Sequence, residues 1–283
     1  METFFSFLAR RVDDCSSLLC VGLDPHPSDL PAPTARAARI FCQHIIKETA
    51  AHAAAFKPNA AFFELHGSDG WTALKDVIAC VHEESARLGS LIPVILDAKR
   101  GDVSSTAEAY AYSAFELLGA NAITLSPYLG RDSLDPFLSY KEKGIFLLCK
   151  TSNPGASDLQ DLPVSIPPAV GADPSETMPL YEHVARLAQE WNTGDNIGLV
   201  VGATQPEALE RVRKVAPDLW FLVPGVGVQG GDLSTALHAG LRPDGKGLLI
   251  TVSRGIARAH SPKDEAARLR DEIINQQYQQ SND

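Results

Sequence analysis

Short apolar runs recur along the chain, and longer amphipathic segments lie between them. Runs such as PVILDAK (93–99) and IGLVVGAT (197–204) are rich in Val, Ile and Leu and lack polar alternation, which is typical of parallel strands covered by helices. The pattern predicts eight strand-plus-helix units. The predicted strands are 18–24, 54–59, 93–99, 122–126, 145–152, 197–204, 219–227 and 247–256, and the helices that follow them are 34–54, 68–88, 104–118, 132–140, 176–191, 206–215, 233–239 and 262–277.

Eight such units favour one fold class, an α/β protein built as a single (β/α)8 TIM barrel over residues 1–283, because this barrel takes about 250 residues. A doubly wound open sheet is the alternative, but no GxGxxG motif follows the first run. The Pro-, Gly- and Asp-rich stretch at about 153–174 is one clear insertion. It is longer than a routine barrel loop, so we expect an excursion or a lid there.

Charge and composition narrow the class of partner. The formal net charge is −10 and 21% of the residues are charged. This balance disfavours non-specific nucleic-acid binding, and an anionic ligand would need locally placed cations. No run approaches the roughly 18 apolar residues of a membrane-spanning helix. The apolar start carries Arg10 and Arg11 after its apolar part, the reverse of a signal peptide, so we expect an amphipathic helix in a cytoplasmic protein with no membrane partner.

Cysteine and histidine spacing gives no sign of a disulfide framework or a metal centre. The five cysteines include no CxxC pair, and the eight histidines include no HxH or HxxxH pair. An odd number of cysteines in a chain of this size favours reduced thiols. The sequence therefore predicts no metal site.

Polar residues end several of the predicted strands. In a barrel, the carboxyl ends of the strands open onto the active site, so such residues are candidates for catalysis or binding. The alternative is that polar residues simply mark where strands end. The residues in question are Asp24, Lys57, Asp97, Lys99, Ser152 and Arg254.

Asp97 and Lys99 form the sharpest pair among these candidates. Residues two apart in a strand point to the same face, so both side chains can project into the barrel mouth. Asp102 follows at the turn before the next helix. A lysine among acids is expected to stay protonated, because opposite charges favour its charged form. Such a cation suits a proton donor better than a Schiff-base nucleophile. A purely structural ion pair at the barrel mouth is the other interpretation.

The segment VPGVGVQGGD (223–232) places four glycines directly after a predicted strand. Glycine lets backbone N–H groups approach an anion closely. Gln229 in this segment and Arg254 after the next strand add side-chain donors, and the loops after strands seven and eight of this barrel often bind phosphate. The pattern predicts a phosphorylated small-molecule ligand. The alternative is that the glycines simply form two flexible turns.

These motifs together resemble the orotidine 5′-phosphate decarboxylase family, in its longer bacterial-type (type 2) branch. The family signature is matched by Asp97, Lys99, Asp102, Val103 and Thr106, and DAKRGD is accompanied by PGVGVQGGD and SRGI. The resemblance implies decarboxylation of orotidine 5′-monophosphate to UMP and CO2, the last step of de novo pyrimidine nucleotide synthesis. It also implies no cofactor, no metal and a homodimer with shared active sites.

The resemblance also assigns roles to individual residues. Lys99 would protonate C6 of the pyrimidine, and Asp97 would lie against the substrate carboxylate and position Lys99. Asp102 would complete the neighbouring subunit's site, with Thr106 near it. The substrate-binding set would be Asp24 and Lys57 at the ribose, Ser152 at the pyrimidine, Gln229 and Arg254 at the 5′-phosphate, and Val103, Pro224 and Gly255.

Two other functions compete with this one. A metal-dependent sugar-phosphate decarboxylase or aldolase of the same barrel superfamily resembling hexulose-phosphate synthase shares a similar Asp-x-Lys-x-x-Asp motif. Those enzymes usually carry an additional acid on the same strand, whereas Val94, Ile95 and Leu96 precede Asp97 here. The second alternative is a catalytically inactive barrel that binds nucleotides or a partner protein, which the presence of both acids and the lysine disfavours.

Overall fold

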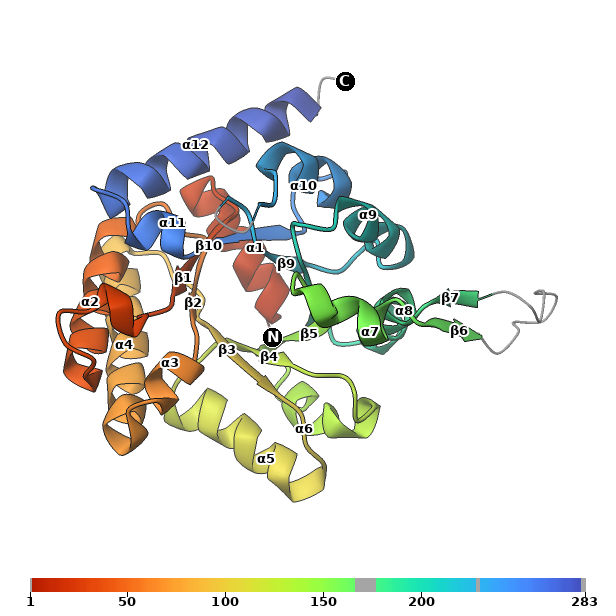
Figure 1. Cartoon of the computed structure of the whole chain (residues 1–283), viewed down its shortest axis with the longest axis horizontal. Coiled ribbons are helices and arrows are strands. Elements are labelled where there is room, and N and C mark those ends of the chain that lie inside the picture. Colours follow the sequence, from red (N-terminus) through yellow and green to blue (C-terminus); the bar gives the residue numbers. More distant parts are fainter. Residues whose placement is uncertain (1, 166–176, 228–229, 281–283) are drawn as a thin grey trace.

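Eight parallel strands form a barrel in the computed structural model, which describes residues 2–165, 177–227 and 230–280 (Figure 1). The sheet runs in the order β2-β1-β10-β9-β8-β5-β4-β3. Bridges between Phe56 and Val94 and between Asn59 and Asp97 join its two ends, β2 and β3. The barrel strands are β1 (Leu19–Leu23), β2 (Ala55–Pro58), β3 (Ile95–Arg100), β4 (Ala122–Leu125), β5 (Gly144–Lys150), β8 (Ile197–Val201), β9 (Phe221–Pro224) and β10 (Leu248–Val252).

Helices surround the barrel (Figure 1). The longer ones are α1 (Phe4–Cys15), α2 (Ala35–Thr49), α4 (Gly67–Leu88), α5 (Ser104–Tyr112), α8 (Leu180–Trp191), α9 (Pro206–Val215), α10 (Leu233–Gly240) and α12 (Pro262–Gln280). The shorter ones are η1 (Pro27–Asp29), α3 (Ala61–Glu64), η2 (Ser113–Leu117), η3 (Arg131–Ser133), α6 (Asp135–Leu138), η4 (Pro154–Ala156), α7 (Ser157–Gln160) and α11 (Arg254–Ala257).

The expected order of strands and helices is confirmed, and the differences lie at the ends of elements. The helix predicted from residue 176 begins at Leu180 instead. Pro179 disfavours helical backbone at Met178 before it, and residues 177–179 pair as strand β7 (Thr177–Pro179) with β6 (Pro163–Ser165). The helix predicted to reach residue 54 ends at Thr49, because residues 53 and 54 already lead into β2.

Helix α1 covers the amino-terminal ends of the strands. Phe4 and Phe5 both pack edge-on against Phe146 of β5, and Phe5 stacks on Trp220 just before β9. Phe4 lies so close to Gly144 that a Cβ there would come within 2.3 Å of its ring. The amphipathic opening segment therefore fills one mouth of the barrel with aromatic side chains, which leaves the opposite mouth for a ligand.

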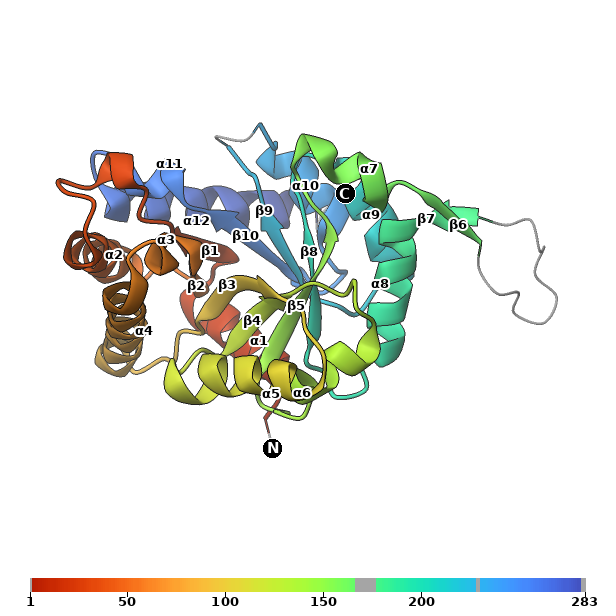
Figure 2. The same cartoon turned by 60° about the horizontal axis from the view of Figure 1, so that its bottom comes forward.

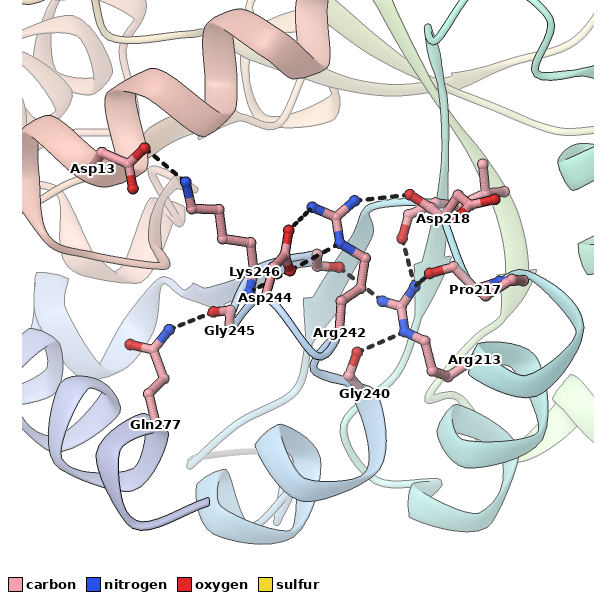
Figure 3. Close-up of polar contacts among 12 residues, drawn as sticks. Asp13, Arg213, Pro217, Asp218, Gly240, Arg242, Asp244, Gly245, Lys246 and Gln277 are labelled. Carbon is pink, nitrogen blue, oxygen red and sulfur yellow. Dashed lines mark hydrogen bonds and ion pairs between the residues drawn. The ribbon is translucent and has the colours of Figure 1, made fainter. Parts of the chain in front are cut away.

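A partly buried polar cluster fixes the loops at that same closed mouth (Figure 3). The Arg213 guanidinium lies 3.7 Å from the centre of the Phe221 ring. It donates to the carbonyls of Gly240, Leu219 and Gly247 at 2.8, 2.7 and 3.0 Å. Leu219 and Gly247 lie in the segments that enter β9 and β10, and Gly240 ends α10. One side chain of α9 thus joins two neighbouring loops and the end of α10.

The insertion predicted at about 153–174 extends from the carboxyl end of β5. Its described part holds η4, α7 and the antiparallel pair β6–β7, which projects from the barrel beside α8 (Figure 2). Lys150, at the end of β5, is buried and binds Asp161 at 2.6 Å. Residues 166–174 lie outside the described residues, so the expected lid remains a prediction.

All five cysteines are buried and free, in agreement with the expected reduced thiols. Burial raises the pKa of the thiols of Cys20, Cys42 and Cys149, which makes them poor nucleophiles. In the part of the chain that the structure describes, no helix is long and apolar enough to cross a membrane.

Candidate active site

A cavity of about 480 Å³ opens at the carboxyl ends of the barrel strands. Eight of the predicted site residues line it, although they come from six different strands and the loops after them. They are Asp24, Lys57, Asp97, Lys99, Ser152, Pro224, Arg254 and Gly255. The predicted residues therefore lie around one cavity, and their functional roles stay a prediction.

Asp97 stands between two lysines in this cavity. Its Oδ2 lies 2.8 Å from Lys57 Nζ, and its Oδ1 lies 2.5 Å from Lys99 Nζ. The side chains of Lys57 and Asp97 are 7% and 10% exposed, whereas that of Lys99 is 50% exposed. The Lys57 ammonium is thus buried inside the barrel, whereas the Lys99 side chain reaches the open part of the cavity.

The charged forms of the buried pair stabilise each other. Burial by itself would raise the pKa of the Asp97 carboxyl, but Lys57 and then Lys99 outweigh it and hold that pKa well below its usual range. Burial by itself would lower the pKa of Lys57, but Asp97 and then Asp24 raise it above its usual value. Asp97 is therefore an anion and Lys57 a cation across the whole physiological range.

The strand that carries Asp97 and Lys99 is not regular. Leu96 pairs with Ile123 and Arg100 with Leu125, so three residues of β3 oppose the single residue Thr124 of β4. Lys99 lies in the left-handed region with φ +48°, which costs a residue with a Cβ about 1–3 kcal/mol. The predicted proximity of the two charges is thus correct, but a bulge creates it rather than the ordinary alternation of a strand.

One buried carboxylate oxygen in the cavity can still accept a hydrogen bond. Asp24 follows β1, and its Oδ1 is buried with no hydrogen-bond partner among the described residues. The hydroxyl of Ser253, beside Arg254, is in the same condition. Buried polar atoms of this kind normally find partners, so both are suited to hydroxyl or other polar groups of a ligand.

The loops after β9 and β10 form another wall of the cavity. Pro224 ends β9 and Gly225 follows it, whereas Arg254 and Gly255 begin α11 after β10. Gly225 has φ +102°, and a Cβ at Gly231 would lie 2.6 Å from the Gly225 carbonyl oxygen, so this turn needs glycine at both places. Gln229, the predicted phosphate ligand of this loop, lies outside the described residues.

The loop after β5 brings Ser152 to the cavity, and the insertion holds that loop in place. Gln160 of α7 also lines the cavity. Its Oε1 accepts from Thr151 N at 2.9 Å, and its Nε2 donates to Thr151 Oγ1 at 2.8 Å. The side-chain amide thus fixes both the backbone and the side chain of the residue next to Ser152.

Three predicted residues do not line the cavity of this chain. Asp102, Val103 and Thr106 lie beyond the end of β3 and at the start of α5, and Val103 as a whole residue is 45% exposed. Asp102 accepts a hydrogen bond from Val103 N at 2.8 Å. Arg100 is also outside the cavity and forms an ion pair with Glu64 of α3.

Sequence reasoning missed several residues of the cavity, of which Asn59, Thr124 and Gln160 bear most on its geometry. Threonine favours strands, so Thr124 looked like an ordinary member of the run AITLS. Gln160 lies in an insertion without periodicity. The described residues contain no group of three or more His, Cys, Asp or Glu side chains placed to hold a metal ion.

The family model described as "Orotidine 5'-phosphate decarboxylase / HUMPS family" matches residues 17–269. The chain is 49% identical over 276 residues to an orotidine 5′-phosphate decarboxylase of Halorubrum lacusprofundi, covering 93% of this chain and 92% of the relative. Among solved structures, Leishmania donovani OMP decarboxylase is 51% identical with a TM-score of 0.84, covering 98% of this chain and 99% of that one.

A second solved structure, Leishmania donovani UMP synthase, is 52% identical with a TM-score of 0.87. The match covers 98% of this chain but only 57% of that longer protein. The curated relatives do not favour a sugar-phosphate decarboxylase or aldolase, because those at 46–51% identity are named as orotidine 5′-phosphate decarboxylases. With its family model, relatives and fold in agreement, the chain belongs to the orotidine 5′-phosphate decarboxylase family.

Proposed function

We propose that this protein converts orotidine 5′-monophosphate to UMP and CO2, without a cofactor or metal, as the last step of pyrimidine nucleotide synthesis. The observation that carries the proposal is the charge array Lys57–Asp97–Lys99, with its outer ammonium half exposed in the cavity. Membership of the family, with 49% identity to one curated relative, also supports the proposal.

The reaction needs a cation beside C6 of the pyrimidine. As the C6–carboxylate bond breaks, its electron pair stays on C6 in the plane of the ring, where the π-system cannot delocalise it. Lys99 Nζ, fixed at 2.5 Å from Asp97, stabilises that charge without reorganising. Its proton then forms the new C6–H bond, and solvent returns a proton to the amine.

Asp97 has two tasks in this scheme. It fixes the Lys99 ammonium, and it stays ionised because Lys57 holds its other oxygen at 2.8 Å. A fixed anion in this position also faces the carboxylate of the substrate, which favours departure of that carboxylate as neutral CO2. In this scheme the negative charge leaves the carboxylate beside Asp97 and develops on C6 beside the Lys99 ammonium.

The rest of the nucleotide has complementary groups around the cavity. The unpartnered Oδ1 of Asp24 suits a ribose hydroxyl, and Ser152 suits the amide edge of the pyrimidine. Arg254, the first residue of α11 after β10, suits the 5′-phosphate because guanidinium groups bind phosphate with two donors. Gln229, Pro224 and Gly255 complete the phosphate end in this proposal.

We further propose a homodimer in which Asp102 and Thr106, with Val103, serve the partner's site. Their position outside the cavity of one chain supports this arrangement. Half of the large apolar side chains that are exposed in the described part of the chain lie between residues 103 and 129, namely Val103, Tyr110, Tyr112, Leu117, Tyr128 and Leu129. Exposed apolar side chains concentrated in one part of the chain are consistent with a protein interface there. For a biosynthetic enzyme of this family we propose a cytoplasmic location.

The direct test is to incubate the EDTA-treated protein with orotidine 5′-monophosphate and follow the loss of its ultraviolet absorbance. Turnover without added metal is expected. Absence of turnover would overturn the proposed activity, and turnover that depends on Mg²⁺ would favour the metal-dependent alternative.

A further inference from the structure

The bulge in β3 has its own polar anchor on the neighbouring strand. Where three residues of β3 oppose one residue of β4, regular ladder hydrogen bonds are lost. The hydroxyl of Thr124 replaces them, because Thr124 Oγ1 accepts from Ala98 N and from Lys99 N, each at 3.0 Å. The left-handed backbone of Lys99 is thus fixed by a side chain and not by the sheet.

The same hydroxyl also holds the catalytic carboxylate. Thr124 Oγ1 donates to Asp97 Oδ1 at 3.0 Å, and this is the oxygen that binds Lys99 Nζ at 2.5 Å. A hydroxyl has one proton to donate and two lone pairs to accept, so Thr124 uses its full capacity. Its side chain is also buried, with a residue exposure of 1%, which leaves water little access to substitute for it.

Two charges therefore depend on one neutral group. Asp97 Oδ2 is held by Lys57 from β2, whereas Oδ1 is shared by Thr124 and Lys99. Without the hydroxyl, the amides of residues 98 and 99 lose their acceptor. The backbone that aims Lys99 would then relax, and the carboxylate would lose one of the contacts that set its rotation.

We propose that Thr124 is a positioning residue, which orients Asp97 and Lys99 for the reaction through its hydrogen bonds. This inference rests on the proposed role of Lys99 as the proton donor. It assigns to the hydroxyl an effect on the chemical step rather than on substrate affinity, because the groups proposed to bind ribose and phosphate lie on other strands.

The test compares Thr124→Val, which has nearly the same shape but no hydroxyl, with Thr124→Ser, which keeps it. For Thr124→Val we expect kcat to fall about 10- to 100-fold, in line with the effect of small misplacements in an active site. KM should change little, since ground-state binding is untouched. Thr124→Ser should recover most of kcat. A Thr124→Val enzyme with wild-type kcat, or a Thr124→Ser enzyme as slow as the valine variant, would overturn the proposal.

A matched control separates positioning from a general loss of a buried hydrogen bond. Thr49 is also fully buried, and its Oγ1 donates to Ile45 O at 2.7 Å within α2, away from the cavity. Thr49→Val likewise removes a buried threonine hydroxyl, and kcat should be unchanged. If Thr124→Val does not fold, Thr124→Ala and Thr124→Ser supply the same comparison.

The outcome also distinguishes this proposal from the proposed activity. If the wild-type protein fails to decarboxylate the nucleotide, the activity is wrong, and no variant can rescue it. The positioning itself is then measured by the crystal structure of Thr124→Val, in which Lys99 Nζ should leave Asp97 Oδ1. An active wild type together with an unmoved Lys99 in that structure would refute the role of Thr124 alone.

Discussion

Lys57 Nζ lies 2.8 Å from Asp97 Oδ2, and both side chains are almost fully buried in the barrel. Moving two charges out of water is expensive, and their mutual attraction repays the cost only in part. Such a pair is therefore retained for its geometry rather than for stability. Here the geometry keeps a carboxylate ionised beside Lys99, which is the condition that the proposed chemistry requires.

Removing one member of this pair should be worse than removing both. Lys57→Met leaves a buried carboxylate with Lys99 as its remaining cation, and we expect a loss of about 3–5 kcal/mol in the free energy of unfolding. The double variant Lys57→Met/Asp97→Leu should regain part of that loss, although it should be inactive. Urea unfolding measures both effects, with the exposed Lys75→Met as control. A double variant less stable than either single variant would contradict this expectation.

Acid should weaken the fold through Asp97. The folded pKa of this carboxyl is lowered by Lys57 and Lys99 despite burial, whereas the unfolded value is about 3.9. Its stabilisation is therefore present above about pH 4 and is lost as the pH falls towards the folded pKa. Because the pKa of Lys57 is raised, its contribution persists up to about pH 10 and is lost only at still higher pH.

The measurement is urea unfolding between about pH 6 and pH 3 for the wild type and Asp97→Asn. The difference in unfolding free energy should shrink as the pH falls, because the asparagine lacks the titration. The exposed Asp132→Asn serves as the control for the same type of substitution away from the site. A constant difference for Asp97→Asn would mean that this carboxylate does not titrate with a lowered pKa.

The sequence was sufficient for the barrel because its strands are covered by helices and are therefore continuous apolar runs. Charges such as Asp97 and Arg254 stood out against these runs, so the shared cavity was also predictable. The contact of Lys57 with Asp97 was not, because it depends on how β2 closes against β3. The bulge was not predictable either, because the sequence of β3 fits a regular strand. Its anchor, Thr124, is a residue type that is common in ordinary strands.

The insertion was recognisable only as a break in the pattern. Pro163 and Pro179 disguise the short pair β6–β7, since proline is depleted in strands. The hydrogen bonds between Gln160 and Thr151 join residues nine apart in an irregular loop, where no periodicity applies. Its part in shaping the cavity is visible only in the folded structure.

The shared-site proposal predicts complementation between two inactive enzymes. Lys99→Ala should abolish turnover of its own site, and Asp102→Ala should impair the partner's site. In an equal mixture with free subunit exchange, about half of the dimers are hybrids, and each hybrid holds one intact site. Activity should recover to about a quarter of the wild-type level for such a two-fold dimer.

Subunit exchange must be shown independently, for example by mass spectrometry of the mixed dimers. The control mixes Lys99→Ala with itself after the same exchange procedure, and no activity should appear. Confirmed hybrids without any activity would exclude a site completed by Asp102 of the second subunit.

Arg213 should matter for stability and not for catalysis. It lies at the closed mouth of the barrel, where its guanidinium joins the loops before β9 and β10 (Figure 3). Arg213→Met leaves several carbonyls without their donor, and we expect a loss of about 3 kcal/mol in the free energy of unfolding. Arg211→Met on the same helix removes the half-exposed pair with Glu182 and should cost less than about 1 kcal/mol.

Urea unfolding and steady-state kinetics on both variants check the prediction. Since the catalytic array lies at the opposite mouth, kcat should be unchanged in both, and a selective fall of kcat in Arg213→Met would show that the closed mouth is coupled to the site.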